Sequence, residues 1–387
     1  MAVRGSTPLL VTLLTAGCAA QEVAAPPEEI EEIEEIGEVV EASNDEAAAQ
    51  SRELPEPVLT LDTDHVIITN PIFLEGAVVV GLEGGGLVAI DIPRDLGKSR
   101  PAVRWRQSID SPIVSGLSGA HGRIHATLFD NSTATFDGHS GEQLWRRPGS
   151  TWSTAAPLPV GDLVLASDPG EAVALDSASG RELWRAPLDG TARVTPAADD
   201  SLIFLATDFG FVHAVTPSRG EEQWRRRLGA KPVAGPTVTG DLLLIPVVGN
   251  RIIALNTATG AMAWSTTLTS PLKSAVTAGV GLAVVGTDTG EVHALDLSDG
   301  ERLWSSIVEG PVSANPHIAE GLLYIPSESE TLHILNSATG EELSRRPLGS
   351  MGRSAPGDND VIVCLGEHRS VTCYPKRPPA GSSWIGR

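Results

Sequence analysis

The sequence predicts an all-β fold, an eight-bladed β-propeller built from four-stranded repeats of about 40 residues. Three observations carry this prediction: a tryptophan that recurs at a fixed interval, a strand-and-turn unit around it, and a composition rich in turn residues. Gly (40) and Pro (28) are abundant while aromatic residues make up only 4% of the chain. This composition is typical of many tight turns between short strands.

Tryptophan marks the period of the repeat. It occurs at Trp105, Trp145, Trp184, Trp224, Trp264 and Trp304. Successive spacings are therefore 39 or 40 residues, and the next expected position holds Ser344. We assign these tryptophans a structural role, in which each indole fills the gap between two sheets and its N–H reaches a backbone carbonyl.

The unit before each tryptophan reads as a strand, a tight turn and a second strand, as in EAVALDSASGRELW over 171–184. The alternation of apolar and polar residues has the period of two that a half-buried strand requires. Asp176 ends the first strand and can bond the backbone two residues on, while Gly180 supplies the positive φ that closes the turn.

Eight copies of the strand that precedes the turn set the number of blades. They lie at 85–91, 132–137, 171–176, 211–216, 251–256, 291–296, 331–336 and 369–375. The last copy has no following tryptophan strand, whereas the segment 55–71 stands unpaired before the first blade. We therefore predict a propeller over 58–376, with an N-terminal strand that completes the last blade and leaves no open edge, and a C-terminal tail over 377–387.

The first 18 residues predict an export signal. Arg4 supplies a positive start, PLLVTLL is a short apolar run, and small residues precede Cys18. The string LLTAGC resembles the bacterial lipobox, in which the Cys is acylated, although Thr15 stands where Leu is usual. This resemblance implies a lipid anchor at Cys18, and Ala19 after it implies the periplasmic side of the outer membrane.

Residues 19–57 predict a solvated acidic tether. They hold twelve Glu and Asp45 against the single base Arg52. Like charges in this density repel one another and favour an extended linker. The whole chain has a net charge of −21, so it lacks the basic footprint that nucleic acid or an anionic bilayer surface attracts. We expect contact with the membrane through the lipid anchor alone.

The sequence predicts no catalytic, cofactor-binding or metal-binding residues. His213, His293 and His333 share one repeat position in different blades, where a structural role is expected. His121 and His125 are four residues apart, a spacing that on a strand separates them by about 13 Å. No G-x-S-x-G or H-E-x-x-H motif is present.

One loop departs from the repeat. Between Asp91 and Trp105 the chain carries six residues more than in the other blades, and this stretch is basic on an acidic body. Its cations are Arg94, Lys98, Arg100, Arg104 and Arg106. They form a candidate partner-binding loop, and the alternative is a tolerated surface insertion. Deletion of 93–101 distinguishes the two, because only the first alternative predicts the loss of a co-purifying partner.

Cys364 and Cys373 fall on the last two strands of the propeller. A two-residue turn at His368 and Arg369 places them opposite each other, whereas alignment with an earlier blade offsets them by one pair. Export permits a disulfide. A disulfide and two free thiols both remain open, and non-reducing mass spectrometry separates them.

The A-L-D-x-x-T/S-G-x-x-x-W unit resembles the repeat of the pyrroloquinoline-quinone-type propellers. Eight such blades on an exported lipoprotein are similar to the BamB family of the outer-membrane barrel-assembly machine. The resemblance covers 58–376 and implies a non-catalytic protein-binding scaffold whose partner is that machine and its unfolded clients. Two alternatives are an envelope sensor or ligand-binding propeller, and a quinone-dependent dehydrogenase. The dehydrogenase is disfavoured because this chain lacks the adjacent Cys pair and an assignable calcium set.

Overall fold

The computed structural model describes residues 59–92, 102–149, 155–348, 354–356, 361–367 and 370–375. The predicted signal peptide, the tether, the C-terminal tail and Cys18 lie outside these residues. Throughout the described part the chain forms strands and turns, without a helix. Accordingly, the described residues contain no helix with the length and apolarity needed to cross a bilayer.

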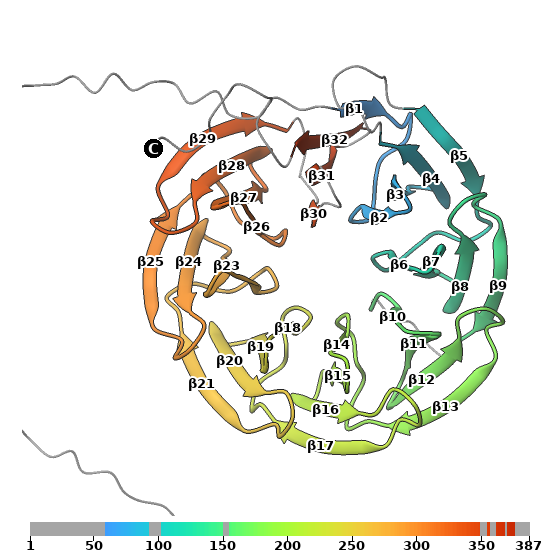
Figure 1. Ribbon diagram of the computed structural model, residues 1–387, viewed down its shortest axis with the longest axis horizontal. Coiled ribbons are helices and arrows are strands. Elements are labelled where there is room, and N and C mark those ends of the chain that lie inside the picture. The colour runs from blue at the N-terminus through green and yellow to red at the C-terminus, as the bar shows by residue number, and fades with distance from the viewer. Residues whose placement is uncertain are drawn as a thin grey trace, which may run out of the picture. The chain divides into compact units, whose positions relative to one another are not determined.

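The strands form eight four-stranded antiparallel sheets arranged around a central axis (Figure 1). Seven sheets, here called blades 1 to 7, each use four consecutive strands.
Blade 1 contains β2 (Ile72–Leu74), β3 (Ala77–Leu82), β4 (Gly86–Asp91) and β5 (Ala102–Ser108). Blade 2 contains β6 (Ser118–Ala120), β7 (Arg123–Thr127), β8 (Ser132–Asp137) and β9 (Gln143–Pro148). Blade 3 contains β10 (Leu158–Val160), β11 (Leu163–Asp168), β12 (Glu171–Asp176) and β13 (Glu182–Pro187).

Blades 4 to 7 repeat the pattern. Blade 4 contains β14 (Ala197–Ala198), β15 (Ile203–Ala206), β16 (Phe211–Val215) and β17 (Glu222–Arg227). Blade 5 contains β18 (Thr237–Thr239), β19 (Leu242–Val247), β20 (Arg251–Asn256) and β21 (Met262–Thr267). Blade 6 contains β22 (Thr277–Gly279), β23 (Leu282–Gly286), β24 (Glu291–Asp296) and β25 (Arg302–Ile307). Blade 7 contains β26 (His317–Ala319), β27 (Leu322–Ser327), β28 (Thr331–Asn336) and β29 (Glu342–Pro347).

The eighth sheet, here called the closing sheet, is composite. It contains β30 (Ser354–Pro356), β31 (Val361–Glu367), β32 (Ser370–Pro375) and, on its outer side, β1 (Leu59–Asp62). The pairing of β1 with β32 runs from Leu59 opposite Cys373 to Asp62 opposite Ser370. The all-β propeller of four-stranded blades is therefore confirmed, with seven blades continuous in sequence and one sheet that joins the two ends of the ring.

Each predicted turn is held by its own side chains. In blade 3 the carboxylate of Asp176 accepts hydrogen bonds from the backbone N–H of Ser179 at 2.8 Å and from its hydroxyl at 2.5 Å. These bonds, the hydroxyl one foremost, lower the pKa of Asp176. Gly180 closes the turn with a φ of 70°. The extra residue of this turn appears as a register shift between the third and fourth strands, between Ala174 and Leu175 in this blade.

The tryptophans connect consecutive blades, as predicted. Each indole N–H donates to a backbone carbonyl in the turn of the next blade at 2.8–3.1 Å. The six pairs are Trp105 with Gly138, Trp145 with Ser177, Trp184 with Pro217, Trp224 with Thr257, Trp264 with Leu297, and Trp304 with Ser337. The ring is therefore tied together at its outer wall, blade by blade, from blade 1 to blade 7.

A second series of hydrogen bonds ties the inner strands. Hydroxyls in the first strand of blades 2, 5 and 6 donate to carbonyls 39 residues further on, in the next blade: Ser118 to Pro157, Thr237 to Val276 and Thr277 to Pro316. The apolar core lies between these two series. One cluster, for example, joins Leu165 and Ala174 of blade 3 to Ile203 of blade 4. Burial between neighbouring sheets fixes the blades relative to one another.

Candidate functional site

The predicted partner loop is only partly described. Arg94, Lys98 and Arg100 lie outside the described residues. Arg104 pairs with Asp91 at 2.6 Å, and its Nη2 donates to the Glu75 carbonyl at 3.0 Å. Arg106 donates to the Thr63 carbonyl at 2.9 Å and pairs with Asp64 at 3.2 Å. These two arginines make intramolecular contacts in and beside blade 1, while the role of the loop in partner binding stays a prediction.

The two cysteines of the closing sheet lie directly opposite each other in the backbone register of β31 and β32. Directly opposed residues in an antiparallel pair have Cα atoms about 4.5–5.5 Å apart, which falls within the range of disulfides. The register thus agrees with the two-residue turn, and the offset alignment is wrong. Whether Cys364 and Cys373 are bonded stays a prediction.

The repeat-position histidines are buried within their sheets, and two of them pair through Nδ1 with a Glu of the fourth strand. In blade 4 the Nδ1 of His213 lies 2.7 Å from Glu222, and its Nε2 accepts the backbone N–H of Asp189 at 3.0 Å. Nδ1 therefore carries the ring hydrogen and donates a hydrogen bond to the Glu222 carboxylate. Arg225 completes the network through an ion pair with Asp189 at 2.6 Å. We call these four residues the blade 4 tetrad.

A related arrangement lies 120 residues later, in blade 7, where the Nε2 of the histidine faces the Ser327 hydroxyl at 3.3 Å. There His333 lies 2.6 Å from Glu342, and Arg345 pairs with Glu342 at 2.8 Å and with Glu309 at 3.7 Å. An arrangement that returns at the same repeat positions belongs to the fold. It anchors the connection that enters the blade, because Asp189 and Glu309 lie on the segments that precede β14 and β26. The structural role expected for these histidines is consistent with this geometry.

A cavity of about 370 Å³ opens beside the blade 4 tetrad, at the junction of blades 3 and 4. Its wall includes all four tetrad residues together with Leu188 and Gly220. The polar groups of the tetrad already form hydrogen bonds and an ion pair with one another. A ligand in the cavity would therefore meet charges that are already paired. No local sequence pattern signals this cavity, because it arises between residues of two blades.

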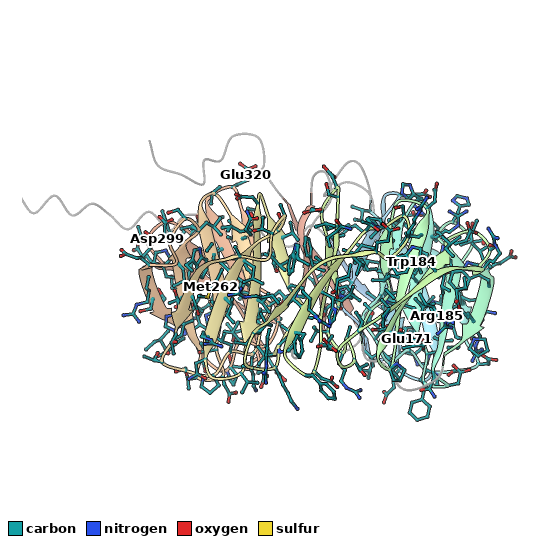
Figure 2. All side chains as sticks on the ribbon, turned by 90° about the horizontal axis from the view of Figure 1, so that it is seen from below. Glu171, Trp184, Arg185, Met262, Asp299 and Glu320 are labelled. Carbon is teal, nitrogen blue, oxygen red and sulfur yellow. The ribbon has the colours of Figure 1, made fainter. Side chains whose placement is uncertain are left out.

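Three exposed apolar side chains gather on one end of the ring. Phe129, Phe209 and Val248 occupy the hairpin between the second and third strands of blades 2, 4 and 5, and are 64%, 72% and 57% exposed. Equivalent hairpins share one face because every blade runs in the same direction; we call it the hairpin face. In Figure 2, Glu171, next to such a hairpin, lies towards the lower edge, whereas Glu320 lies at the upper edge.

Blade 4 and the connection after it also expose cationic side chains. Arg226, Arg227 and Lys231 are exposed, and the guanidinium of Arg227 lies 5.9 Å from the centre of the Phe211 ring. Lys231 belongs to the connection whose backbone carbonyl accepts the N–H of Val248 at 2.8 Å. Blades 4 and 5 therefore present an aromatic and basic surface on an acidic protein. In blade 5 the sequence holds a signal for it, since Val248 stands where blades 3, 4, 6 and 7 have an acid.

A metal-bound quinone would need a cluster of ligating side chains. Over the residues that the structure describes, no group of three or more His, Cys, Asp or Glu side chains is placed to hold a metal ion. No two of the three cysteines are adjacent in the sequence, since they stand at Cys18, Cys364 and Cys373. We therefore assign no residue to such a cofactor.

Solved structures share this architecture at low sequence identity. BamB from Moraxella catarrhalis has a TM-score of 0.69 and 19% identity, over 83% of this chain and 98% of that chain. A europium-containing methanol dehydrogenase has a TM-score of 0.67 and 14% identity, over 80% and 84%. A quinohemoprotein alcohol dehydrogenase from Comamonas testosteroni has a TM-score of 0.69 and 12% identity, over 86% and 78%. These likenesses show the fold alone.

Sequence comparison shows the family. A search of curated protein sequences gives no match. A family model described as outer membrane protein assembly factor BamB, however, matches residues 63–200 and 208–370, which include almost the whole ring. The chain therefore belongs to the BamB family of outer membrane protein assembly factors.

Proposed function

We propose that this protein is a non-catalytic scaffold in the assembly of outer-membrane β-barrel proteins, held by a lipid on Cys18 at the periplasmic side of the outer membrane. The match of the BamB family model to both halves of the ring is the observation that carries the proposal. A ring tied at its inner and outer walls suits a scaffold, because it presents loops in fixed relative positions.

The hairpin face of blades 4 and 5 is the proposed contact with the assembly machine. Phe209 and Val248 offer exposed apolar anchors, and Arg226, Arg227 and Lys231 supply exposed positive charge on blade 4 and on the connection to blade 5. Aromatic and arginine side chains are the residue types that contribute most to protein interfaces. The partner surface is accordingly expected to be acidic with an apolar centre.

The test is a crosslinked pull-down from native membranes, with Cys18→Ala as the control for anchoring. We expect the wild type to recover an outer-membrane barrel-assembly protein. Phe209→Glu and Val248→Glu should reduce recovery by roughly tenfold or more. Phe129→Glu, which changes the same kind of exposed side chain on blade 2, should leave recovery unchanged. Recovery of nothing from the machine by correctly anchored wild type contradicts the proposal.

An envelope sensor is the second candidate function, and the cavity at the junction of blades 3 and 4 favours it. A sensor is distinguished by a small molecule that raises the melting temperature of the wild type and loses this effect in Arg225→Ala, which changes an exposed side chain on the cavity wall. A quinone-dependent dehydrogenase would show quinone-dependent dye reduction by the purified protein.

A further inference from the structure

The outer wall of the ring is made of strand edges. In each of the seven blades the fourth strand hydrogen-bonds to the third strand on one side and has no strand on its other side among the described residues. An edge of this kind presents unpaired N–H and C=O groups that another strand can meet. The seven outer edges are therefore equivalent in backbone and differ only in their side chains.

Most of these edges carry residues that discourage pairing. The position after the tryptophan, or after Ser344 in blade 7, is arginine in five blades: Arg106, Arg146, Arg185, Arg225 and Arg345. Three of these strands also end in proline, namely Pro148, Pro187 and Pro347. Charged side chains and proline are the devices that protect edge strands from unwanted partners.

Two neighbouring edges lack both devices. In β21 and β25 the position after the tryptophan holds Ser265 and Ser305, and the strands end in Thr267 and Ile307. Figure 1 shows these strands next to each other on the periphery of the ring. All seven blades have the same strand order, so a difference in fold does not explain why these two edges lack the protective residues.

The unprotected edges also expose apolar side chains. Met262 is 56% exposed and lies on the outer wall of blade 5 (Figure 2), while Leu303 and Ile307 of blade 6 are 52% and 78% exposed. Both strands are hydrogen-bonded to the turn of the next blade. Thr266 donates to the Gly300 carbonyl at 2.7 Å, and Ser306 donates to the Gly340 carbonyl at 2.5 Å. They form a partly apolar edge whose one charged residue is Arg302, at the start of β25.

We propose that the outer edges of β21 and β25 bind an extended segment of an unassembled β-barrel protein by adding it as a further strand. This inference rests on the proposed function and adds a second surface, separate from the hairpin face. The chemistry of the edge selects the occupant: a segment without acidic residues, since the chain carries −21, and with alternating apolar side chains. Membrane-spanning β-strands have this alternation before they reach the lipid.

The probe is a fluorescein-labelled synthetic peptide of about nine residues, the length of a transmembrane β-strand, with alternating Val or Tyr and Thr. Fluorescence anisotropy should show saturable binding to the wild type. The same peptide, N-methylated on the residues that face the edge, should bind roughly tenfold or more weakly, because its backbone donors are lost. Absence of binding by the wild type, or equal binding of the methylated peptide, overturns the proposal.

Protein variants locate the edge. One variant introduces the protective residues of the other blades into β21 and β25: Ser265→Arg with Thr267→Pro, and Ser305→Arg with Ile307→Pro. It should bind the peptide roughly tenfold or more weakly. The reciprocal variant, Arg345→Ser with Pro347→Thr, changes exposed residues on β29 and should gain binding. Thermal unfolding checks that each variant folds. Undiminished binding by the folded protected variant overturns the assignment to these strands.

The same variants separate this inference from the proposed function. The protected variant should still recover the assembly protein in the membrane pull-down, whereas Phe209→Glu should still bind the peptide. Loss of partner recovery with retained peptide binding leaves the edge site in place, and the reverse result leaves the scaffold in place.

Discussion

At the scale of single residues, the contact between tryptophan and glycine decides how closely two blades approach. Each of the six tryptophans lies against a turn glycine of the next blade, and a Cβ on that glycine would meet the indole at 2.4–2.7 Å. At Gly260 the nearest atom would be Cε3 of Trp224, at 2.5 Å. Glycine is therefore required at this turn for space as well as for its φ of 66°.

Gly260→Ala separates these two requirements. We expect it to lower the free energy of unfolding by about 2–4 kcal/mol, because the methyl group pushes Trp224 out of its packing. Gly240→Ala is the matched control: its φ is 55°, and a Cβ there meets nothing within 4 Å. It should cost about 1 kcal/mol for backbone strain alone. Equal losses in chemical denaturation would show that the tryptophan contact does not constrain the turn.

A buried histidine makes stability depend on pH. Burial, followed by the positive charge of Arg123, lowers the pKa of His125 from 6.5 to about 4. Its Nδ1 lies 2.7 Å from the Thr135 hydroxyl, while its Nε2 has no hydrogen-bond partner within the described part of the chain. Between these two pKa values the unfolded chain binds a proton that the folded protein excludes, so stability is full above pH 6.5 and falls as the pH falls towards 4.

The expected slope between pH 6.5 and pH 5 is up to about 1.4 kcal/mol per pH unit from this one residue. His125→Gln should flatten the slope, measured as the free energy of unfolding against pH. His139→Gln, at an exposed turn, is the control and should leave the slope as it is. A slope that His125→Gln does not change would assign the pH dependence to other groups.

At the scale of the element, equivalent strands of different blades differ in which polar networks they complete. Blade 6 has the histidine of the tetrad, His293, but Arg302 stands at the position of Glu222 and Ser305 at that of Arg225. His293 is buried, with no hydrogen-bond partner on either ring nitrogen among the described residues, although Nε2 lies 3.3 Å from Glu291. Burial chiefly, with a contribution from Arg302, lowers the pKa of His293, while Glu291 opposes the shift.

Arg302→Glu should restore the pair of histidine and glutamate that blade 4 has. The new carboxylate takes the place that Glu222 has in blade 4, so the pKa of His293 should rise, since a positive neighbour is replaced by a negative one. Arg302→Gln removes the positive charge only and should give a smaller rise. NMR titration of the His293 ring provides the measurement. A pKa that stays the same in both variants would show that Arg302 does not act on this histidine.

At the scale of the whole molecule, the two ends of the ring meet in the closing sheet. The described tryptophan contacts run from blade 1 to blade 7, and the series stops at Ser344. Beyond that point the closing sheet depends on β1, which pairs with β32 over four residues. A short strand from the start of the ring therefore closes it.

A chain that begins at Thr63 should be less stable than one that begins at Val58, because only the second retains β1. We expect a lower melting temperature and aggregation through the freed edge of β32. Light scattering during thermal unfolding reports both. Identical behaviour of the two chains would mean that the closing sheet holds together without its outer strand.

The sequence by itself determined the period, the turn chemistry and the closing strand, because these are local patterns repeated at a fixed interval. A tryptophan in six of the blades and a turn glycine in six were enough to place the strands. Tertiary structure alone decided the cavity beside His213, the pairing of Arg104 and Arg106 within the fold, and the neighbourhood of β21 and β25. Each of these depends on residues from different blades or distant parts of the chain, whose contact follows from ring closure, and no local pattern encodes that contact.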